Sequence, residues 1–435
     1  MVLSTQPYKG ARDFYPEDKR LQKHIFGVMR TVAERFGYEE YDAPILEPLE
    51  LYLSKSSQEV VNEQTYTFTD RGDRQVSIRP EMTPTVSRMV AGRRQELAYP
   101  LRWYSIPNLW RYERPQRGRL REHWQLNVDL FGVPGLEAEH EIIQVADEVM
   151  QTFGAKRDMY VIKLNSRKLI NTYLHDVLSL DNTQTPTLIR LIDRMHKLDQ
   201  AEFIGQADAV FSPSQRDAGA SEQLFDFLKA QSIDELPEQL SGHESVQELK
   251  RLIELLRSTF ITNLEFDPTL MRGFDYYTDI VFEVFDKDPD NNRSMFGGGR
   301  YDGLVGLFGV EPVATIGFGM GDVTLQNFLE SHGLLPMLKS ETDLHVVLID
   351  DVYAKAQKIL AELRDAGVNV SVDTSGKKLD KQLKNASKKG ANYVLIIGQK
   401  ELEDEQFTLK NLSTSDEEKH GLDRIVSIVK DFRKT

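Results

Sequence analysis

The chain has 435 residues, of which 40% are hydrophobic and none is cysteine, and its formal net charge at pH 7 is −14. This length exceeds what one hydrophobic core usually supports, so we expect two or three domains. The lack of cysteine excludes disulfides and thiolate zinc sites, and the negative charge argues against indiscriminate binding of nucleic acid, so any RNA contact must come from local basic patches. Because no window holds 18 apolar residues and the N-terminal segment lacks an apolar signal core, we expect a soluble, cytoplasmic protein without membrane contact.

The first predicted elements alternate between helix and strand. Residues 19–37 are expected to form an amphipathic helix, because Ile25, Met29 and Val32 recur near helical spacing and Gly37 follows as a stop. The strand-like run YDAPILEPLELY comes next, and the alternation of residues 66–79 predicts a hairpin turned at residues 70–73. Further along, residues 136–153 are predicted to be helical and residues 160–164 to form a strand.

One segment between these elements is positively charged, although the whole chain is negative. Six arginines and only two acids lie between residue 102 and Trp124. Two apolar, β-rich runs, residues 102–110 and 124–131, flank a polar turn with Pro115 and Gly118, which predicts an antiparallel hairpin with a cationic tip. Guanidinium groups are planar, permanently charged and bidentate, so such a tip suits a phosphate. Taken alone, the segment is equally compatible with a solvated basic loop.

The second half of the chain changes character twice. Residues 165–265 have few β-branched runs and several breakers, which predicts a helical insertion domain. β-rich sequence returns at residues 279–285 and, after a polar loop, at residue 295. A polar linker at residues 333–341 precedes alternating strand and helix patterns, which predict a small α/β domain with a largely parallel sheet. The expected domains are residues 1–164 with 266–332, residues 165–265 and residues 343–435.

Four segments resemble, in order and spacing, the motifs of one enzyme family. The run RYERPQRGR (residues 111–119) is similar to motif 2 of class II aminoacyl-tRNA synthetases, in the form found in histidyl-tRNA synthetases. SIRPEMTPTVSR (residues 77–88) is similar to their amino-acid-binding segment. LMRGFDYYTDIVFEVF (residues 270–285) resembles their histidine-specific signature, and FGGGRYDGL (residues 296–304) resembles the glycine-rich strand that follows it. The likeness spans nearly the whole chain.

This resemblance implies a fold and an activity. The fold would be α+β: a class II antiparallel sheet flanked by helices, with a helical insertion and a C-terminal α/β domain that reads single-stranded anticodon bases. The first helix and strand would form motif 1, with Pro44 at a homodimer interface. The implied reaction is ATP-dependent activation of L-histidine to histidyl-adenylate, followed by transfer to the 3′ end of tRNA(His). Mg²⁺ would accompany the ATP, and no protein-bound metal is expected.

The chemistry of activation requires cations. Attack of a carboxylate on the α-phosphate of ATP brings two anions together, so positive charge must neutralise both. By resemblance, Arg111 and Arg272 are the catalytic residues; a buried arginine paired with Asp275 is the alternative for Arg272. The resemblance assigns to ATP the residues Arg111, Arg119, Arg121, His123 and Gly319. It assigns to the tRNA acceptor end the residues Arg114 and Gln116.

Recognition of histidine requires an anion for the α-ammonium group and hydrogen-bonding partners for the two ring nitrogens. By resemblance, Asp129 faces the imidazole. The implied histidine-binding residues are Glu81, Thr83, Gln125, Asp129, Tyr276, Tyr277 and Tyr301. For each tyrosine, simple packing within a sheet is the alternative. Alternation along a strand would point Tyr276 and Tyr277 to opposite faces, so we expect only one of them to contact the ligand.

Two positions depart from the family pattern. Motif 3 normally ends with an acid and an arginine that stacks on adenine, whereas GFGMGDVTLQNF (residues 317–328) has Val323 and Thr324 there. His123 occupies a position where an aromatic ring often covers the other face of adenine. The missing arginine would suit a different function, that of the non-catalytic relative that regulates ATP phosphoribosyltransferase. The anticodon-type domain and Arg272 favour the ligase, and a bare RNA-binding module would leave the histidine-pocket residues unexplained.

Overall fold

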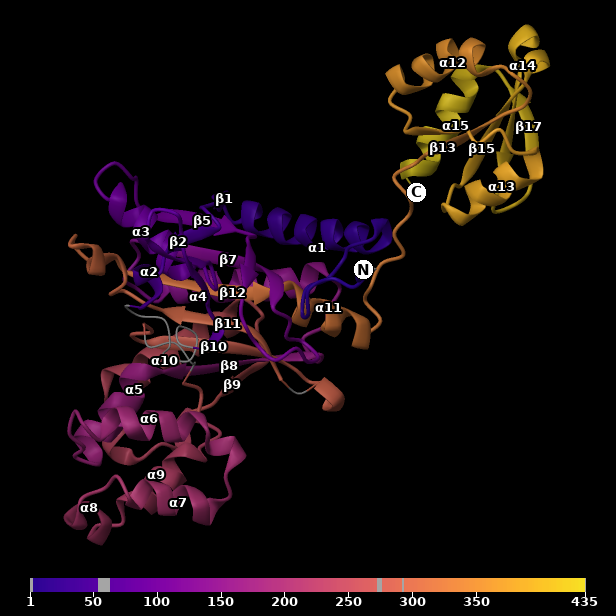
Figure 1. Cartoon of the computed structure of the whole chain (residues 1–435). Helices are drawn as coiled ribbons and strands as arrows, with labels where there is room; N and C mark the ends of the chain where they lie inside the picture. Colours follow the sequence, from indigo (N-terminus) through magenta and orange to yellow (C-terminus); the bar gives the residue numbers. More distant parts are fainter. Residues whose placement is uncertain (1–2, 54–62, 272–275, 292, 435) are drawn as a thin grey trace. The chain divides into compact units, whose positions relative to one another are not determined.

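The computed structural model describes residues 3–53, 63–271, 276–291 and 293–434. The chain divides into two compact units, Met1–Leu335 and Pro336–Thr435 (Figure 1), and each is described by itself. Across the described ranges, no helix is both long and apolar enough to cross a membrane.

The first unit is built on a nine-stranded sheet with the order β1-β5-β7-β12-β11-β10-β8-β9, in which β6 also pairs with β7. The central pairs are antiparallel, whereas the outer pairs β1–β5 and β8–β9 are parallel. The strands are β1 Glu39–Glu40, β5 Leu101–Ser105, β6 Asn108–Trp110, β7 Glu122–Phe131, β8 Tyr160–Ser166, β9 Leu264–Phe266, β10 Ile280–Asp286, β11 Ser294–Arg300 and β12 Thr315–Gly321. This architecture confirms the predicted antiparallel sheet of an α+β fold.

Helices α1 (Pro16–Arg35) and α4 (Glu137–Thr152) pack against each other and bury their apolar faces in one core with the sheet. Helix α1 begins three residues before the predicted start, because Pro16 occupies the first helical position and the Asp18 carboxylate accepts a hydrogen bond from the Tyr15 backbone N–H at 3.2 Å. Its end precedes Gly37, whose φ of +80° cannot continue a helix. The remaining helices near the sheet are α2 Glu50–Leu53, α3 Thr83–Gly92 and α11 Asp322–Ser331.

Both predicted hairpins are present. Strands β3 (Tyr66–Thr69) and β4 (Gln75–Ile78) form the first with β2 (Leu46–Pro48), and the Asp70 carboxylate accepts hydrogen bonds from the Gly72 and Arg74 N–H groups at 2.8 and 3.0 Å. In the arginine hairpin, the strand predicted for residues 102–110 is interrupted at Pro107, which has no N–H to donate. The pairing with β7 nevertheless keeps one register, because Ser105 lies opposite Asn127 and Asn108 opposite Trp124.

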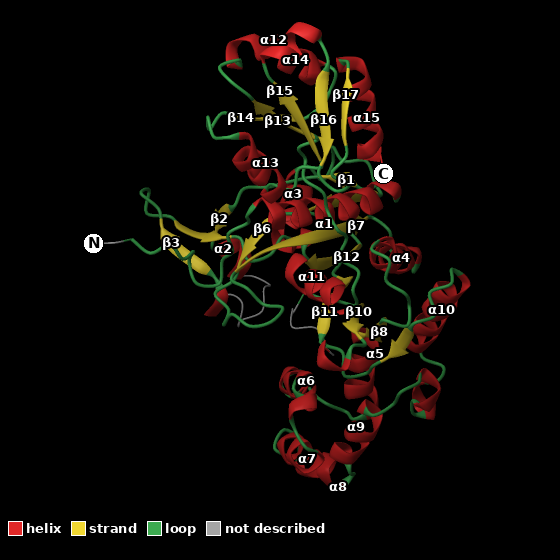
Figure 2. Ribbon diagram, turned by 90° about the vertical axis from the view of Figure 1, so that its right-hand side faces the viewer, coloured by secondary structure: helices red, strands yellow, loops and turns green. Residues whose placement is uncertain are grey.

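Residues 165–265 are mostly helical, as predicted. Residues 185–228 lie beyond β8 and β9 at one side of the sheet, whereas the helix at residues 244–258 packs against α4 (Figures 1 and 2). The helices are α5 Arg167–Thr172, α6 Thr185–Asp193, α7 Gln200–Asp208, α8 Pro213–Asp217, α9 Ala220–Leu228 and α10 Glu244–Ser258. The Ser166 hydroxyl caps α5 by accepting a hydrogen bond from the Leu169 N–H at 3.2 Å. Leu188 and Phe203 belong to the same buried cluster as Leu164 of the sheet, so the division of this segment as a separate domain stays a prediction.

The second unit has a five-stranded sheet of order β14-β13-β15-β16-β17, covered by helices. Its elements are β13 Leu344–Leu348, α12 Tyr353–Asp365, β14 Val370–Asp373, α13 Leu379–Lys388, β15 Tyr393–Ile397, α14 Gln399–Asp404, β16 Phe407–Asn411, β17 Glu417–His420 and α15 Leu422–Lys434. The predicted α/β class is confirmed, but a largely parallel sheet is wrong. Strand β13 pairs in parallel with β14 and β15, whereas β15–β16 and β16–β17 are antiparallel. The turn between β16 and β17, with Ser415 at a φ of +66°, is too short for a parallel crossover.

Candidate active site

A cavity on the central sheet brings together residues that are far apart in the sequence. Its lining consists of Glu81, Thr83, Arg111, Gln125, Asn127, Asp129, Tyr276, Tyr277, Tyr301, Gly317, Phe318 and Gly319. Every residue predicted to bind histidine is in this set, together with Arg111 and Gly319. These side chains come from β7, β12, the start of α3 and the segments around β10 and β11. The fold therefore assembles the predicted amino-acid site at one place.

Strand alternation explains the polar wall of this cavity. Gln125, Asn127 and Asp129 are two residues apart on β7, so their side chains emerge on the same face. Opposite them on β12, Gly317 pairs with Asp129, Gly319 with Asn127 and Gly321 with Gln125. A Cβ atom at Gly317 would lie 2.2 Å from Asp129 Oδ1, and one at Gly319 would lie 2.8 Å from the Gln125 amide. The glycines of β12 thus leave the space that the polar side chains of β7 occupy.

Three residues line the cavity without having been predicted from the sequence, namely Asn127, Gly317 and Phe318. Asn127 is the polar one. Its side-chain amide donates a hydrogen bond to the Gln125 carbonyl at 3.0 Å, and only 5% of its surface is exposed. The signal was available, because Asn127 lies between two predicted residues of the same alternating strand face.

Asp129 is a buried carboxylate in this wall, and its pKa is raised. The Tyr301 hydroxyl donates a hydrogen bond to its Oδ1, whereas its Oδ2 is buried and has no hydrogen-bond partner within the described part of the chain. Burial raises the pKa of Asp129 to about 7, and the hydrogen bond from Tyr301 opposes that rise. A buried acceptor without a partner is costly, so this oxygen is suited to a ligand N–H group.

A second buried carboxylate and three aromatic rings complete the pocket. The Tyr276 hydroxyl donates a hydrogen bond to Glu81 Oε2 at 3.3 Å. The ring centroid of Tyr276 lies 4.8 Å from that of Tyr277 and 5.6 Å from that of Tyr301. Tyr276 and Tyr277 both line the cavity rather than pointing to opposite faces of a strand, and the expectation that only one of them contacts the ligand stays a prediction. They precede β10, which begins at Ile280, so strand alternation does not govern their directions.

Arg111 provides a cation at the edge of the same cavity. Its Nε donates a hydrogen bond to the Pro80 carbonyl at 2.9 Å, which holds the guanidinium group beside the residue that precedes Glu81. The other predicted catalytic residue, Arg272, lies outside the described residues, as does Asp275, its alternative partner.

The remaining hairpin residues lie around a different cavity. Arg114, Gln116, Arg119 and Arg121 line it together with Lys9, Glu63, Gln64, Tyr112, Glu113 and Pro115. The guanidinium carbon of Arg121 lies 3.8 Å from the Tyr112 ring centroid, and its Nη1 donates to the Tyr8 hydroxyl at 3.1 Å. Arg119 is 64% exposed, with Nη1 3.6 Å from Glu113 Oε2. The structure therefore packs Arg121 against aromatic rings and leaves Arg119 open to solvent.

His123 lies on the same face of β7 as Gln125. Burial, reinforced by the charges of Arg111 and Arg12, lowers the pKa of His123 to about 3, so its imidazole is neutral. Its Nδ1 has no hydrogen-bond partner among the residues described. The neutral ring of His123, beside cations, is compatible with stacking on a nucleotide base.

Thr324 stands where the family has an arginine. Its hydroxyl donates a hydrogen bond to the Met295 carbonyl at 2.8 Å.

Comparisons with known proteins identify the family of the chain. Residues 10–322 match the family model described as histidyl-tRNA synthetase, and residues 341–432 match one described as anticodon binding domain. The histidine–tRNA ligase of Leptospira biflexa is 44% identical over 414 residues, which cover 95% of this chain and 94% of the relative. That of Thermoplasma volcanium is 37% identical over 419 residues, which cover 96% of each chain. The crystal structure of histidyl-tRNA synthetase from Nostoc sp. PCC 7120 has a similar fold, with a TM-score of 0.80, 23% identity and coverage of 99% of this chain and 100% of that one. The chain therefore belongs to the histidyl-tRNA synthetase family.

Proposed function

We propose that this chain is a histidine–tRNA ligase, which forms histidyl-adenylate from ATP and L-histidine and then transfers histidine to the 3′ end of tRNA(His). The observation that carries the proposal is the cavity in which two buried carboxylates, Asp129 and Glu81, lie among three tyrosines. Histidine presents an ammonium group and an imidazole with two nitrogens, so it can satisfy both carboxylates at once. The names of the curated relatives support the same activity.

Each lining residue has a proposed role in binding histidine. Asp129 accepts a hydrogen bond from an imidazole N–H through its open Oδ2, while Tyr301 holds the other oxygen. Glu81 and Thr83 bind the α-ammonium group, and Gln125 is a further polar contact. The rings of Tyr276 and Tyr277 enclose the imidazole.

In the activation step, a histidine carboxylate oxygen attacks the α-phosphorus of ATP and pyrophosphate leaves. Arg111 and Arg272 are the catalytic residues, because their charge stabilises the anions that approach each other. Arg119, Arg121, His123 and Gly319 are the further ATP-binding residues. The Mg²⁺ that accompanies ATP is bound by the nucleotide phosphates, and we assign no protein ligand to it. In the second step, a terminal ribose hydroxyl of the tRNA attacks the carbonyl carbon and AMP leaves.

The tRNA has two proposed contact regions. Arg114 and Gln116 bind the acceptor end from the tip of the hairpin, and residues 343–435 read the anticodon. The match of residues 341–432 to an anticodon-binding family supports the second assignment.

We also propose a cytoplasmic homodimer joined through the segment around Pro44. Its support is the adjacent pair Ile45 and Leu46, which are 52% and 47% exposed in the single chain. Large apolar side chains that are exposed in a single chain become buried where they lie at an interface.

Histidine-dependent exchange of labelled pyrophosphate into ATP tests the proposal. We expect exchange with L-histidine and none with other amino acids. The alternative is the regulatory subunit of ATP phosphoribosyltransferase, which Thr324 in place of the family arginine favours. A folded chain that binds histidine without catalysing exchange would support that alternative, and a chain that does neither would overturn both.

A further inference from the structure

The first turn of α5, which lies outside the cavity lining, contacts the backbone that carries the pocket tyrosines. The Arg167 side chain donates hydrogen bonds from Nε and Nη2 to the Met271 carbonyl at 3.3 and 3.0 Å, and from Nη1 to the Tyr277 carbonyl at 3.4 Å. Its backbone N–H donates to the Asp279 carbonyl at 3.0 Å. One residue thus joins three carbonyls of the segment that leads into β10.

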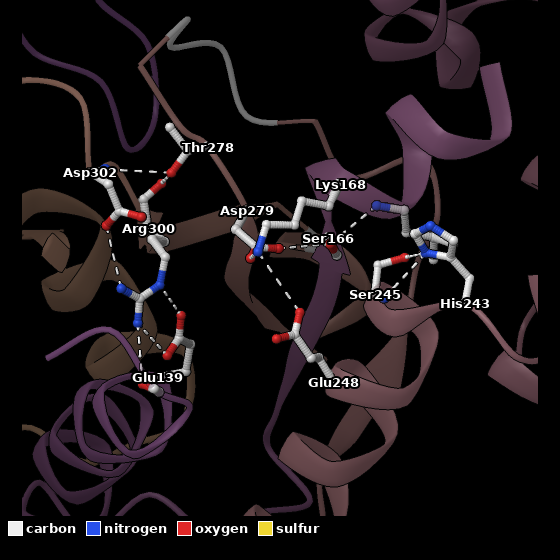
Figure 3. A network of polar contacts seen from close by, with 12 residues as sticks. Glu139, Ser166, Lys168, His243, Ser245, Glu248, Thr278, Asp279, Arg300 and Asp302 are labelled. Carbon is white, nitrogen blue, oxygen red and sulfur yellow. Dashed lines mark hydrogen bonds and ion pairs between the residues drawn. The ribbon is translucent and has the colours of Figure 1, made fainter. Parts of the chain in front are cut away.

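The neighbours of Arg167 hold the same segment through Asp279 (Figure 3). The Ser166 hydroxyl donates to Asp279 Oδ1 at 2.9 Å, and Lys168 Nζ lies 2.5 Å from Asp279 Oδ2. Lys168 also lies 3.8 Å from Glu248 of α10, which connects this turn to the helical segment. The start of α5 therefore holds, through polar contacts, the end of residues 276–279, which we call the tyrosine segment.

The opposite side of the segment is held by β11. The Thr278 N–H donates to the Arg300 carbonyl at 2.8 Å. Arg300 is itself fixed, because its guanidinium forms two hydrogen bonds with Glu139 of α4, at 2.5 and 2.7 Å, in a buried ion pair (Figure 3). The backbone of residues 277–279 consequently has fixed contacts on both sides.

Arginine suits this position for a physical reason. Its guanidinium is rigid and planar, carries five donors that point in different directions, and keeps its charge at every physiological pH. A lysine ammonium has a single centre and cannot span the carbonyls of Met271 and Tyr277 with the same fixed geometry. A neutral side chain would leave partly buried carbonyls without donors.

We infer that Arg167 is a positioning residue for histidine recognition, which sets the affinity for histidine by holding the backbone of Tyr276 and Tyr277 without touching the amino acid. Both rings line the cavity, and the Tyr276 hydroxyl bonds to Glu81, so a shift of this backbone displaces the pocket wall. This inference rests on the proposed function, since it assigns histidine as the ligand of that cavity.

The test compares Arg167→Met with the wild type by calorimetric titration of histidine and, separately, of ATP. A misplacement of about 1 Å can cost roughly 10²-fold in the rate of an enzyme reaction. By analogy we expect the Kd for histidine to rise by about 10- to 100-fold, with the Kd for ATP changed by less than about twofold. Arg167→Lys should be intermediate, because an ammonium group can reach one of the two side-chain-bonded carbonyls at a time.

Arg157→Met is the matched control. Arg157 is also partly buried and pairs with the buried Asp147 at 2.6 Å. Among the described residues, it neither lines the cavity nor forms a hydrogen bond or ion pair with residues 276–279. This variant should lower the Tm and leave the Kd for histidine unchanged.

Separate outcomes would overturn the inference and the proposed function. If Arg167→Met lowers only the Tm, as the control does, or weakens histidine and ATP equally, Arg167 has a merely structural role. Should that variant fail to fold, wild-type histidine affinity in Arg167→Lys would have the same meaning. A wild type that binds histidine but lacks histidine-dependent exchange would defeat the proposed ligase, while the calorimetric comparison would still decide the role of Arg167.

Discussion

The hydroxyl of Tyr301 donates a hydrogen bond to Oδ1 of Asp129, which leaves Oδ2 of that buried carboxylate as an acceptor without a partner in the described part of the chain. Burial raises the pKa of Asp129 to about 7. The carboxylate proposed to face the imidazole therefore changes its ionisation in the physiological pH range. The hydrogen bond from Tyr301 lowers its pKa and so favours the ionised form.

Tyr301→Phe should weaken histidine binding near neutral pH. The lost hydrogen bond stabilised the ionised carboxylate, so the pKa of Asp129 should rise further and more of it should be protonated. In calorimetric titrations between about pH 6 and 8, wild-type affinity should increase with pH, and the profile of the variant should move to higher pH. Superimposable profiles would show that Tyr301 does not act through Asp129.

Asp129→Asn should reduce the pH dependence of stability. The pKa of Asp129 is higher in the folded chain, about 7, than the ordinary aspartate value of about 3.9, so the folded state holds the proton more tightly. This contribution to the free energy of unfolding is complete below about pH 4 and is lost as the pH rises through about 7. Urea denaturation across that range should show a smaller decline in the variant than in the wild type. Asp234→Asn, at a side chain that is 80% exposed, is the control and should keep the wild-type decline.

Gly317→Ala should destabilise the sheet and impair histidine binding. The added Cβ would lie 2.2 Å from Asp129 Oδ1 and 2.6 Å from the Val128 carbonyl, so β7 and β12 would have to separate. Overpacking of this kind costs about 1–3 kcal/mol. In the control Gly27→Ala, within α1, the added Cβ meets nothing within 4 Å, and the free energy of unfolding should rise by about 0.5–1 kcal/mol. Equal urea midpoints for the two variants would contradict the claim that an added Cβ at Gly317 forces β7 and β12 apart.

Arg111→Ala should lower the kcat of histidine-dependent pyrophosphate exchange by roughly 10²–10³, the usual cost of losing one preorganised donor to a developing charge. The control is Arg93→Ala, which removes a 73% exposed arginine that pairs with Glu96 at 3.2 Å, and should leave exchange unchanged. A similar kcat for wild type and Arg111→Ala would remove Arg111 from the catalytic residues.

Most residues that line the cavity could be predicted from the sequence because they lie in short motifs that resemble those of one enzyme family. Gln125 and Asp129 alternate on one strand, and the same alternation could have identified Asn127. The contacts of Arg167 could not be predicted in this way, because its carbonyl partners lie about a hundred residues further along the chain and no periodicity connects them. The antiparallel half of the C-terminal sheet was missed for a related reason, since a strand pattern does not state the direction of its neighbour.

A chain that ends at Leu335 should retain histidine-dependent pyrophosphate exchange but lose most of its efficiency in charging tRNA. The cavity lies wholly within the first compact unit, and the second unit has hydrophobic clusters of its own. Circular dichroism should first establish that the shortened chain is folded. Unchanged kcat/KM for tRNA charging in a folded, shortened chain would show that residues 336–435 do not read the anticodon.

The most direct test of the account is the charging of purified tRNA(His) with labelled histidine by the full-length chain. We predict that the label becomes esterified to the tRNA 3′ end, that this requires ATP, and that Asp129→Asn and Arg111→Ala both reduce its rate. A properly folded chain that binds histidine and ATP but leaves tRNA(His) uncharged would contradict the proposed function.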